Sequence, residues 1–324
     1  MKNNLIFLYP GQGSQYRGMG YDICESFPEA RKIFDRADRY LNFPLSRLCF
    51  EGPEDELNSD LNAQIAVYTA SCAVTEVLRA RHIEPAGVAG YSSGFYAAAY
   101  AADCFDFDAG LDLVRRAGQI LIDEGRNIKG SMAVIFGLPG EQVESICRRT
   151  GTVDVAIRNT PRQIIVSGIQ SSVAQVMETA LAEGALDVYL LPVATAYHST
   201  HMAGSTILFR RYLDTVKVRP PRTALYSYSS LNRVVDEKDL KATMADHLSS
   251  PVLWVDVIEI LRSSGNSLFI EAGPGTVLYR TVRWIDRTIE AMATDTAASV
   301  KAFLARYAME KNAGGGKGSS AGQL

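Results

Sequence analysis

The stretch GVAGYSSGFYAAAYAAD at residues 87–103 constrains the fold more than any other part of the sequence. A short run of small apolar residues ends in GYSSG and continues into an alanine-rich helical pattern. A Gly-x-Ser-x-Gly sequence between a strand and a helix is typical of a nucleophile elbow, a sharp turn that exposes the serine hydroxyl. The pattern therefore predicts an α/β arrangement with Ser92 as a candidate nucleophile. The alternative is a serine at an ordinary strand-to-helix turn.

Length, charge and hydropathy exclude several classes of protein. The 324 residues suffice for one large domain, or for a large domain with a smaller insertion. A net charge of −3 does not favour a nucleic-acid partner. The sequence contains no run of 18 apolar residues, so no membrane span is predicted. The apolar N-terminal stretch is too short for a signal peptide. We expect a cytoplasmic protein that contacts neither nucleic acid nor membrane.

A serine nucleophile needs a base, and the chain has four histidines. His198 and His201 occur together in ATAYHSTHM, just after the last strand of a predicted insertion, where a side chain is well placed to face a cleft between domains. Both are better candidates than His82 and His247. The five cysteines are scattered and form no CxxC pair, which predicts a reducing compartment and no metal site.

The middle of the chain has the pattern of a small α/β unit. Strands are predicted at 132–138, 153–159, 162–168 and 186–193, with helices at 140–150 and 171–184. The resulting order, β-α-β-β-α-β, is that of a ferredoxin-like subdomain.

The remaining segments predict a larger domain around this insertion. Further strands are expected at 5–9, 86–91, 224–228 and 267–273, and helices between them, including one at 18–42. We therefore assign residues 1–128 and 198–311 to a large domain and 129–197 to the small subdomain. Residues 312–324 are rich in glycine and serine, and we expect this tail to be disordered.

Six dispersed motifs carry a resemblance to a known family. They are PGQGSQ (10–15), GYSSG (90–94), NTPRQIIVSG (159–168), TAYHSTHM (195–202), SPVLW (250–254) and EAGPGTVL (271–278). By the order and spacing of these motifs, the chain resembles the malonyl-CoA:acyl-carrier-protein transacylases. This family includes acyltransferase domains of fatty acid and polyketide synthases and discrete trans-acting enzymes. The resemblance implies a large α/β hydrolase-like domain with an inserted ferredoxin-like subdomain. PGQGSQ lacks the lysine of a phosphate-binding loop, so we expect no nucleotide cofactor.

The resemblance also implies a ping-pong mechanism. Ser92 would attack an acyl thioester with His198, rather than His201, as the general base. The backbone N–H groups of Gln12 and Ser93 would form the oxyanion hole. CoA and the phosphopantetheine arm of an acyl carrier protein would be substrate groups, so no cofactor and no metal is expected.

Further site residues follow from the same resemblance. The backbone carbonyl of His247, where the family usually has glutamine, would orient His198. Tyr91 stands where the family elbow usually has histidine, and Tyr197 matches neither common form of the stretch before the base. The residues implied to line the substrate pocket are Gln64, Tyr91, Ala117, Asn159 and Tyr197.

Ala117 is the departure with the largest chemical consequence. Relatives that select malonyl or methylmalonyl groups carry an arginine at this position, which pairs bidentately with the free carboxylate of the acyl group. Here the stretch is LVRRAGQ, and Arg116 would point about 100° away from position 117 on a helix. The sequence favours an acyl group without a carboxylate, unless a shift of the helix brings Arg116 inward.

Four functions remain open at this stage. The leading hypothesis is an acyltransferase between CoA or carrier-protein thioesters in polyketide or fatty acid biosynthesis. An acyl-carrier-protein thioesterase would use water in the second step. A malonyl-CoA:acyl-carrier-protein transacylase, or a subunit of the malonate decarboxylase epsilon type, conflicts with Ala117. A non-catalytic scaffold that binds carrier protein conflicts with the retention of Ser92 and His198.

Overall fold

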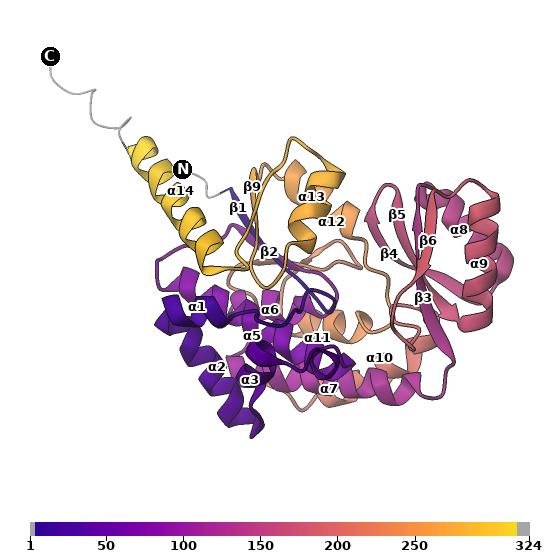
Figure 1. The fold of residues 1–324 in the computed structure, drawn as a ribbon, viewed down its shortest axis with the longest axis horizontal. Coiled ribbons are helices and arrows are strands. Elements are labelled where there is room, and N and C mark those ends of the chain that lie inside the picture. The colour runs from indigo at the N-terminus through magenta and orange to yellow at the C-terminus, as the bar shows by residue number, and fades with distance from the viewer. Residues whose placement is uncertain (1–3, 316–324) are drawn as a thin grey trace, which may run out of the picture.

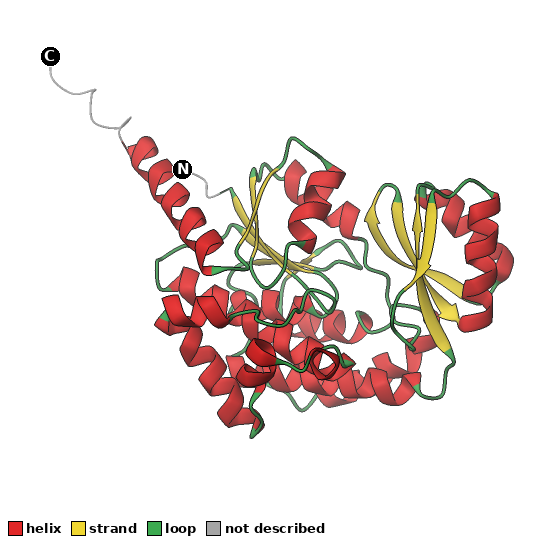
Figure 2. Cartoon of the chain, in the orientation of Figure 1, coloured by secondary structure: helices red, strands yellow, loops and turns green. Residues whose placement is uncertain are grey.

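A computed structural model describes residues 4–315 and contains two β-sheets (Figures 1 and 2). The larger sheet has the strand order β10-β9-β1-β2-β7-β8, and its strands are parallel except for β8, which runs antiparallel to β7. Its strands are β1 (Leu5–Tyr9), β2 (Gly87–Gly90), β7 (Ala224–Tyr226), β8 (Arg233–Val234), β9 (Leu268–Glu271) and β10 (Glu290–Ala293). Parallel strands buried on both faces require apolar residues throughout, as in LIFLY of β1.

Helices surround this sheet. Figure 1 shows α5, α6 and α7 packed together along one side, while α12 and α13 lie between the two sheets. The helices of this part are α1 (Tyr21–Ser26), α2 (Pro28–Leu41), α3 (Leu45–Glu51), α4 (Glu54–Leu57), α5 (Asp60–Arg79), α6 (Gly94–Ala101), α7 (Phe107–Gly125), α10 (Ala203–Leu213), α11 (Glu237–Asp246), α12 (Trp254–Ser263), α13 (Val277–Ile285) and α14 (Ala297–Gly315), with a 3₁₀ turn at Thr200–Met202.

The smaller sheet is antiparallel, with the order β4-β5-β3-β6. Its elements occur along the chain in the expected order β-α-β-β-α-β. They are β3 (Gly130–Phe136), α8 (Gly140–Thr150), β4 (Val153–Thr160), β5 (Gln163–Ile169), α9 (Gln170–Ala182) and β6 (Asp187–Leu190). In Figure 1, α8 and α9 cover the face of this sheet that points away from the larger sheet.

The alternation of side chains along β3 gives the small sheet two different faces. Ala133 and Ile135 belong to a separate small core with α8 and α9. Met132 and Val134 point the opposite way and line a cavity between the two sheets. One face of the small sheet therefore holds this unit together, and the other forms a wall of the candidate site.

Some sequence-based expectations were wrong at the level of elements. The helix expected at 18–42 is divided into α1 and α2, because Phe27 is extended and Pro28 starts a new helix as its first residue. Helix α14 continues to Gly315, so residues 312–315 of the tail are helical; residues 316–324 lie outside the described part. Helices α3 and α4 and strands β8 and β10 were missed. Among residues 4–315, no helix is long and apolar enough to span a bilayer.

Candidate active site

Ser92 lies in a tight turn between β2 and α6, at the carboxyl ends of the parallel strands. Its backbone is left-handed, with φ of 52°, a conformation that non-glycine residues adopt rarely and mostly at functional sites. A Cβ atom at Gly90 would lie 2.3 Å from the backbone of Gly94, and one at Gly94 would lie 2.2 Å from the Tyr9 carbonyl oxygen. Both glycines are therefore required by the close approach of backbone segments, and the turn holds the Ser92 hydroxyl out from the strand.

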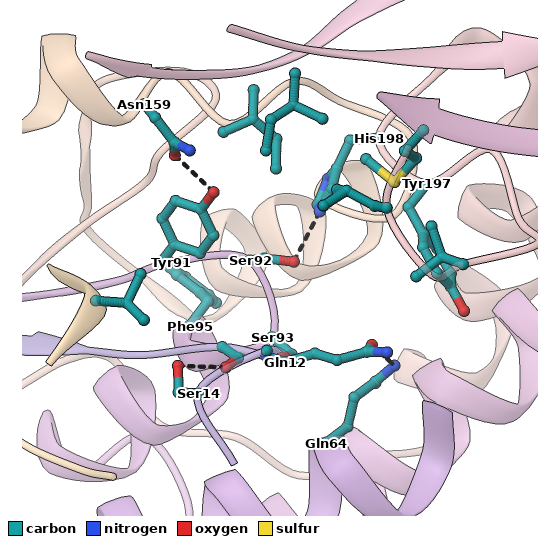
Figure 3. A pocket seen from close by; sticks show the side chains of 18 of the residues that line it. Gln12, Ser14, Gln64, Tyr91, Ser92, Ser93, Phe95, Asn159, Tyr197 and His198 are labelled. Carbon is teal, nitrogen blue, oxygen red and sulfur yellow. Dashed lines mark hydrogen bonds between the residues drawn. The ribbon is translucent and has the colours of Figure 1, made fainter. Parts of the chain in front are cut away.

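His198 lies within hydrogen-bond distance of Ser92 (Figure 3). The Ser92 Oγ and His198 Nε2 atoms are 2.7 Å apart, and His198 Nδ1 is 3.0 Å from the carbonyl oxygen of Ser250. Because a carbonyl can only accept a hydrogen bond, Nδ1 carries the proton. Nε2 then presents its lone pair to the Ser92 hydroxyl, which is the tautomer that a general base requires.

The Ser250 carbonyl accepts from His198 Nδ1, and the expected His247 carbonyl also acts on this imidazole. The His247 carbonyl accepts a hydrogen bond from the Tyr228 hydroxyl at 3.2 Å, whereas Ser250, three residues further along, accepts from His198. The chain turns back after α11, and this turn brings the later carbonyl to the imidazole. The His247 ring instead stacks on Tyr228 at 3.6 Å between ring centroids and lines the cavity.

Burial keeps His198 neutral. Desolvation lowers the pKa of its imidazole from 6.5 to about 4, although the carbonyls of Ser250 and His247 act in the opposite direction. At neutral pH the ring is therefore uncharged and free to accept the hydroxyl proton of Ser92.

The two expected oxyanion donors lie next to each other, since the loop after β1 runs beside the elbow. The N–H of Gln12 donates to the side-chain hydroxyl of Ser93 at 3.1 Å. A substrate carbonyl oxygen that binds to the Gln12 N–H has to displace this hydroxyl. The arrangement thus contains the expected donors, with an internal oxygen atom at the position of the oxyanion.

A chain of polar side chains extends from Gln12. Its side-chain carbonyl accepts from Gln64 Nε2 at 3.1 Å, and its Nε2 donates to Asp60 Oδ1 at 2.6 Å. The second oxygen of Asp60 accepts from the Tyr197 hydroxyl at 2.9 Å. This network joins the loop after β1, the start of α5 and the residue before the base.

Tyr91 and Asn159 connect the elbow to the small sheet. The Tyr91 hydroxyl donates to Asn159 Oδ1 at 2.6 Å (Figure 3), and the Tyr91 ring meets Trp254 edge to face. Asn159 lies on β4, so this hydrogen bond crosses from one sheet to the other. The five residues expected to line the pocket, which are Gln64, Tyr91, Ala117, Asn159 and Tyr197, all do so.

The cavity around these residues has a volume of about 760 Å³. Ala117 is buried in its lining, and no lysine or arginine of the described chain lines it. Arg116 is exposed, with its guanidinium 5.7 Å from the centroid of the Tyr212 ring, so it does not replace the missing arginine. The cavity wall offers no cation to a carboxylate.

Comparisons with known proteins show the family to which this chain belongs. The family described as acyl transferase domain matches residues 6–307. A malonyl CoA-acyl carrier protein transacylase of Bacillus subtilis is 32% identical over 303 residues, covering 92% of this chain and 96% of the relative. The chain belongs to the malonyl-CoA:acyl-carrier-protein transacylase family. It is an acyltransferase.

Two further members of the family are described as proteins of polyketide biosynthesis. A polyketide biosynthesis malonyl CoA-acyl carrier protein transacylase of Bacillus subtilis is 34% identical over 294 residues, covering 89% of this chain and 99% of the relative. A solved malonyl-transacylase in complex with a type II polyketide synthase acyl-carrier protein has a TM-score of 0.90 at 28% identity, covering 93% and 99% of the two chains.

Other candidate residues of the acyltransferase lie apart from the nucleophile. His201 Nε2 is 3.0 Å from the Thr152 carbonyl oxygen, away from Ser92. Over the described residues, no group of three or more histidine, cysteine, aspartate or glutamate side chains could hold a metal ion.

Sequence reasoning missed Asp60 and Ser250 in this acyltransferase. An aspartate in the first turn of a helix is ordinary, and its partner Tyr197 is 137 positions away. The Ser250 carbonyl contributes only backbone, which no residue pattern marks.

Proposed function

We propose that the protein is an S-acyltransferase that moves an acyl group between thioesters of CoA or acyl carrier protein through an acyl-enzyme on Ser92. The observation that carries this proposal is the 2.7 Å contact between Ser92 Oγ and the neutral, correctly protonated imidazole of His198. The adjacent Gln12 and Ser93 N–H groups supply the oxyanion site.

The reaction divides into two similar halves. Ser92 Oγ attacks the thioester carbonyl carbon while His198 Nε2 takes its proton, and negative charge develops on the carbonyl oxygen beside the Gln12 and Ser93 N–H groups. The carbon–sulfur bond then breaks, and His198 returns the proton to the leaving thiolate. A second thiol, deprotonated by His198, attacks the Ser92 ester and releases Ser92 with its proton restored.

We infer that the transferred acyl group has no free carboxylate. Ala117 removes the cation that would pair with a malonyl carboxylate, and Arg116 points to the surface. A carboxylate buried in this cavity without a partner would cost several kcal/mol. The apolar part of the wall, which includes Leu121, Met132 and Val134, suits a hydrocarbon acyl chain.

Intact-protein mass spectrometry tests this proposal. Wild-type protein is incubated briefly with acetyl-CoA, a longer saturated acyl-CoA or malonyl-CoA, with Ser92→Ala as the control. We expect an acetyl or longer acyl adduct and at least tenfold less malonyl adduct, because the carboxylate lacks its partner. Malonyl labelling equal to acetyl labelling would contradict this proposal and indicate a malonyl transferase. Loss of the label without any acceptor thiol would identify a thioesterase.

We propose an acyl carrier protein as the partner and the outer face of α13 as its docking surface. Arg280 and Arg283 are exposed on this helix, Arg287 is exposed just after its end, and none of the three makes an ion pair within the described chain. Val277 of the same helix lines the cavity, and Trp284 is 60% exposed beside Phe136 of the small sheet. A basic helix face with an exposed tryptophan at the cavity suits an acidic carrier that delivers a thioester arm.

Charge reversal tests the docking surface. For Arg280→Glu/Arg283→Glu we expect the KM for acyl carrier protein to rise about tenfold, while labelling by acyl-CoA stays within about twofold, because the carrier alone would contact this face. Arg211→Glu, an exposed arginine of α10, is the matched control. An unchanged KM for the carrier in the double variant would rule out α13 as the docking surface.

We also propose the finer description of the fold. The antiparallel order β4-β5-β3-β6 with two helices on one face supports a ferredoxin-like subdomain at 129–197. The strand–elbow–helix arrangement at Ser92 in a mostly parallel sheet supports the α/β hydrolase-like description of the larger part.

A further inference from the structure

The Asp60 carboxylate lies directly behind the cavity wall. Its two oxygens accept hydrogen bonds from Gln12 Nε2 at 2.6 Å and from the Tyr197 hydroxyl at 2.9 Å, and both donors line the cavity. It has no ion pair with any lysine, arginine or histidine of residues 4–315. The Asp60 charge is thus separated from the cavity only by the side chains of Gln12 and Tyr197, and no cation of the described residues pairs with it.

This charge lies near the end of the cavity that contains Ala117. Asp60 is the first residue of α5, and Gln64 lies one turn further along the same helix. A Cβ atom at Gly118 would be 3.0 Å from Gln64 Oε1 and 3.1 Å from Leu61 Cδ1, so α7 packs against this first turn at the position next to Ala117. Asp60 and position 117, where relatives carry the arginine, therefore lie near the same region of the pocket.

The electrostatic effect of Asp60 reaches its neighbours. Burial, followed by the Asp60 charge and its hydrogen bond, raises the pKa of the Tyr197 hydroxyl. Like charges in a partly buried site repel more strongly than in water. An acyl group that ends in a carboxylate would meet this field, whereas an uncharged acyl group would not.

We propose that Asp60 is a specificity-determining residue that excludes acyl groups with a free carboxylate. This inference rests on the acyl transfer proposed above and assigns its selectivity to a second position besides Ala117. Asp60 also joins the loop of Gln12 to the segment of His198, so its hydrogen bonds contribute to the geometry of the site. The substrates it admits are uncharged acyl thioesters.

The isosteric change Asp60→Asn separates the charge from the hydrogen bonds. The amide oxygen still accepts from Gln12 Nε2, and the amide nitrogen donates to the Tyr197 oxygen. We expect the ratio of malonyl to acetyl labelling rates to rise about tenfold, because one like charge is removed from a partly buried site. Glu56→Gln, which removes an exposed carboxylate outside the cavity, is the matched control and should leave the ratio unchanged.

A second pair of variants tests the same charge independently. An arginine in Ala117→Arg would be drawn to the Asp60 carboxylate, so the single variant should gain little malonyl labelling. In Ala117→Arg/Asp60→Asn the guanidinium is free, and the gain should exceed the product of the two single effects. Asp60→Ser replaces Asp60→Asn if the amide variant does not fold.

The outcomes separate this inference from the proposed function. Acetyl labelling of Asp60→Asn with an unchanged malonyl-to-acetyl ratio, or strictly multiplicative effects in the double variant, would overturn the role of Asp60. Absence of labelling of the wild-type protein by both acetyl-CoA and the longer acyl-CoA would instead contradict acyl transfer itself.

Discussion

At the scale of single residues, the surroundings of His198 determine where its imidazole carries a proton. The Ser250 carbonyl holds the proton of His198 on Nδ1, and burial lowers the pKa of the imidazole. Ser92 and His198 both have left-handed backbones, with φ of 52° and 57°. The strained turns place Oγ and Nε2 together before substrate arrives, so less reorganisation is needed during the reaction.

The depressed pKa of His198 predicts an unusual pH dependence. Only the neutral imidazole is a base, so the rate of Ser92 acylation by acetyl-CoA should stay level from pH 8 to pH 6. It should fall as the pH decreases toward about 4, where the ring becomes protonated. Quenched-flow mass spectrometry gives this rate, and circular dichroism at each pH verifies that the protein is folded. A half-maximal rate near pH 6.5 would show that His198 is not desolvated as the structure indicates.

The residue scale also shows what the sequence could supply. The Gly-x-Ser-x-Gly pattern predicted the turn at Ser92 because its glycines are required there: a Cβ atom on either would lie only 2.2–2.3 Å from neighbouring backbone. The resemblance selected His198 over His201 as the base; His198 Nε2 lies 2.7 Å from Ser92 Oγ, whereas His201 contacts the Thr152 carbonyl. The sequence suggested the His247 carbonyl but not the Ser250 carbonyl, because a carbonyl oxygen belongs to every residue and its position depends on the turn after α11.

At the scale of elements, α13 contacts the larger sheet through its N-terminus and exposes its outer face to solvent. Its first N–H groups, on Leu278 and Tyr279, donate to the buried carboxyl of Glu271 at the end of β9. Its outer face carries the exposed Arg280 and Arg283, and its first residue, Val277, lines the cavity. The helix is thus fixed to the sheet at its N-terminus, where unpaired N–H groups favour an acceptor, and its exposed face remains available to a partner.

Glu271 predicts a pH-dependent stability. Burial raises the pKa of its carboxyl from 4.5 to about 8, so the folded protein retains a proton that the unfolded chain loses. This contribution to stability is present below pH 4.5 and is lost as the pH rises through 8. We expect the Tm of the wild-type protein to fall between pH 5 and pH 9 more steeply than that of Glu271→Gln.

The matched control for this comparison is Glu259→Gln, an exposed carboxyl on α12. Its Tm curve should run parallel to that of the wild-type protein. Parallel curves for Glu271→Gln as well would show that the Glu271 carboxyl is ionised in the folded state at neutral pH, contrary to its burial.

Element predictions succeeded where the hydrophobic period was clear and failed where local backbone geometry decided. The strands and helices of the small sheet were expected in their observed order, since β3 and β5 are apolar runs bounded by turn residues. The break between α1 and α2 at Phe27 was missed, although Pro28 stands in the sequence. The sequence does not show that Phe27 is extended and that Pro28 is the first residue of a new helix.

At the scale of the whole molecule, the site exists only where two sheets face each other. The larger sheet supplies the elbow and the Gln12 loop, while the smaller sheet supplies an apolar wall and Asn159, which accepts from Tyr91 across the gap. The network from Gln64 to Tyr197 links segments that are far apart in sequence. Such long-range contacts follow from tertiary packing, so sequence patterns alone did not reveal Asp60 or the shape of the cavity.

The central claim is that Ser92 becomes acylated, and peptide mapping of the protein after brief incubation with acetyl-CoA tests it most directly. Proteolysis and tandem mass spectrometry of residues 87–103 distinguish Ser92 from its neighbour Ser93. We predict an acetyl ester on Ser92 of the wild-type protein and no adduct in Ser92→Ala. An adduct on Ser93, or one that persists in Ser92→Ala, would contradict the mechanism.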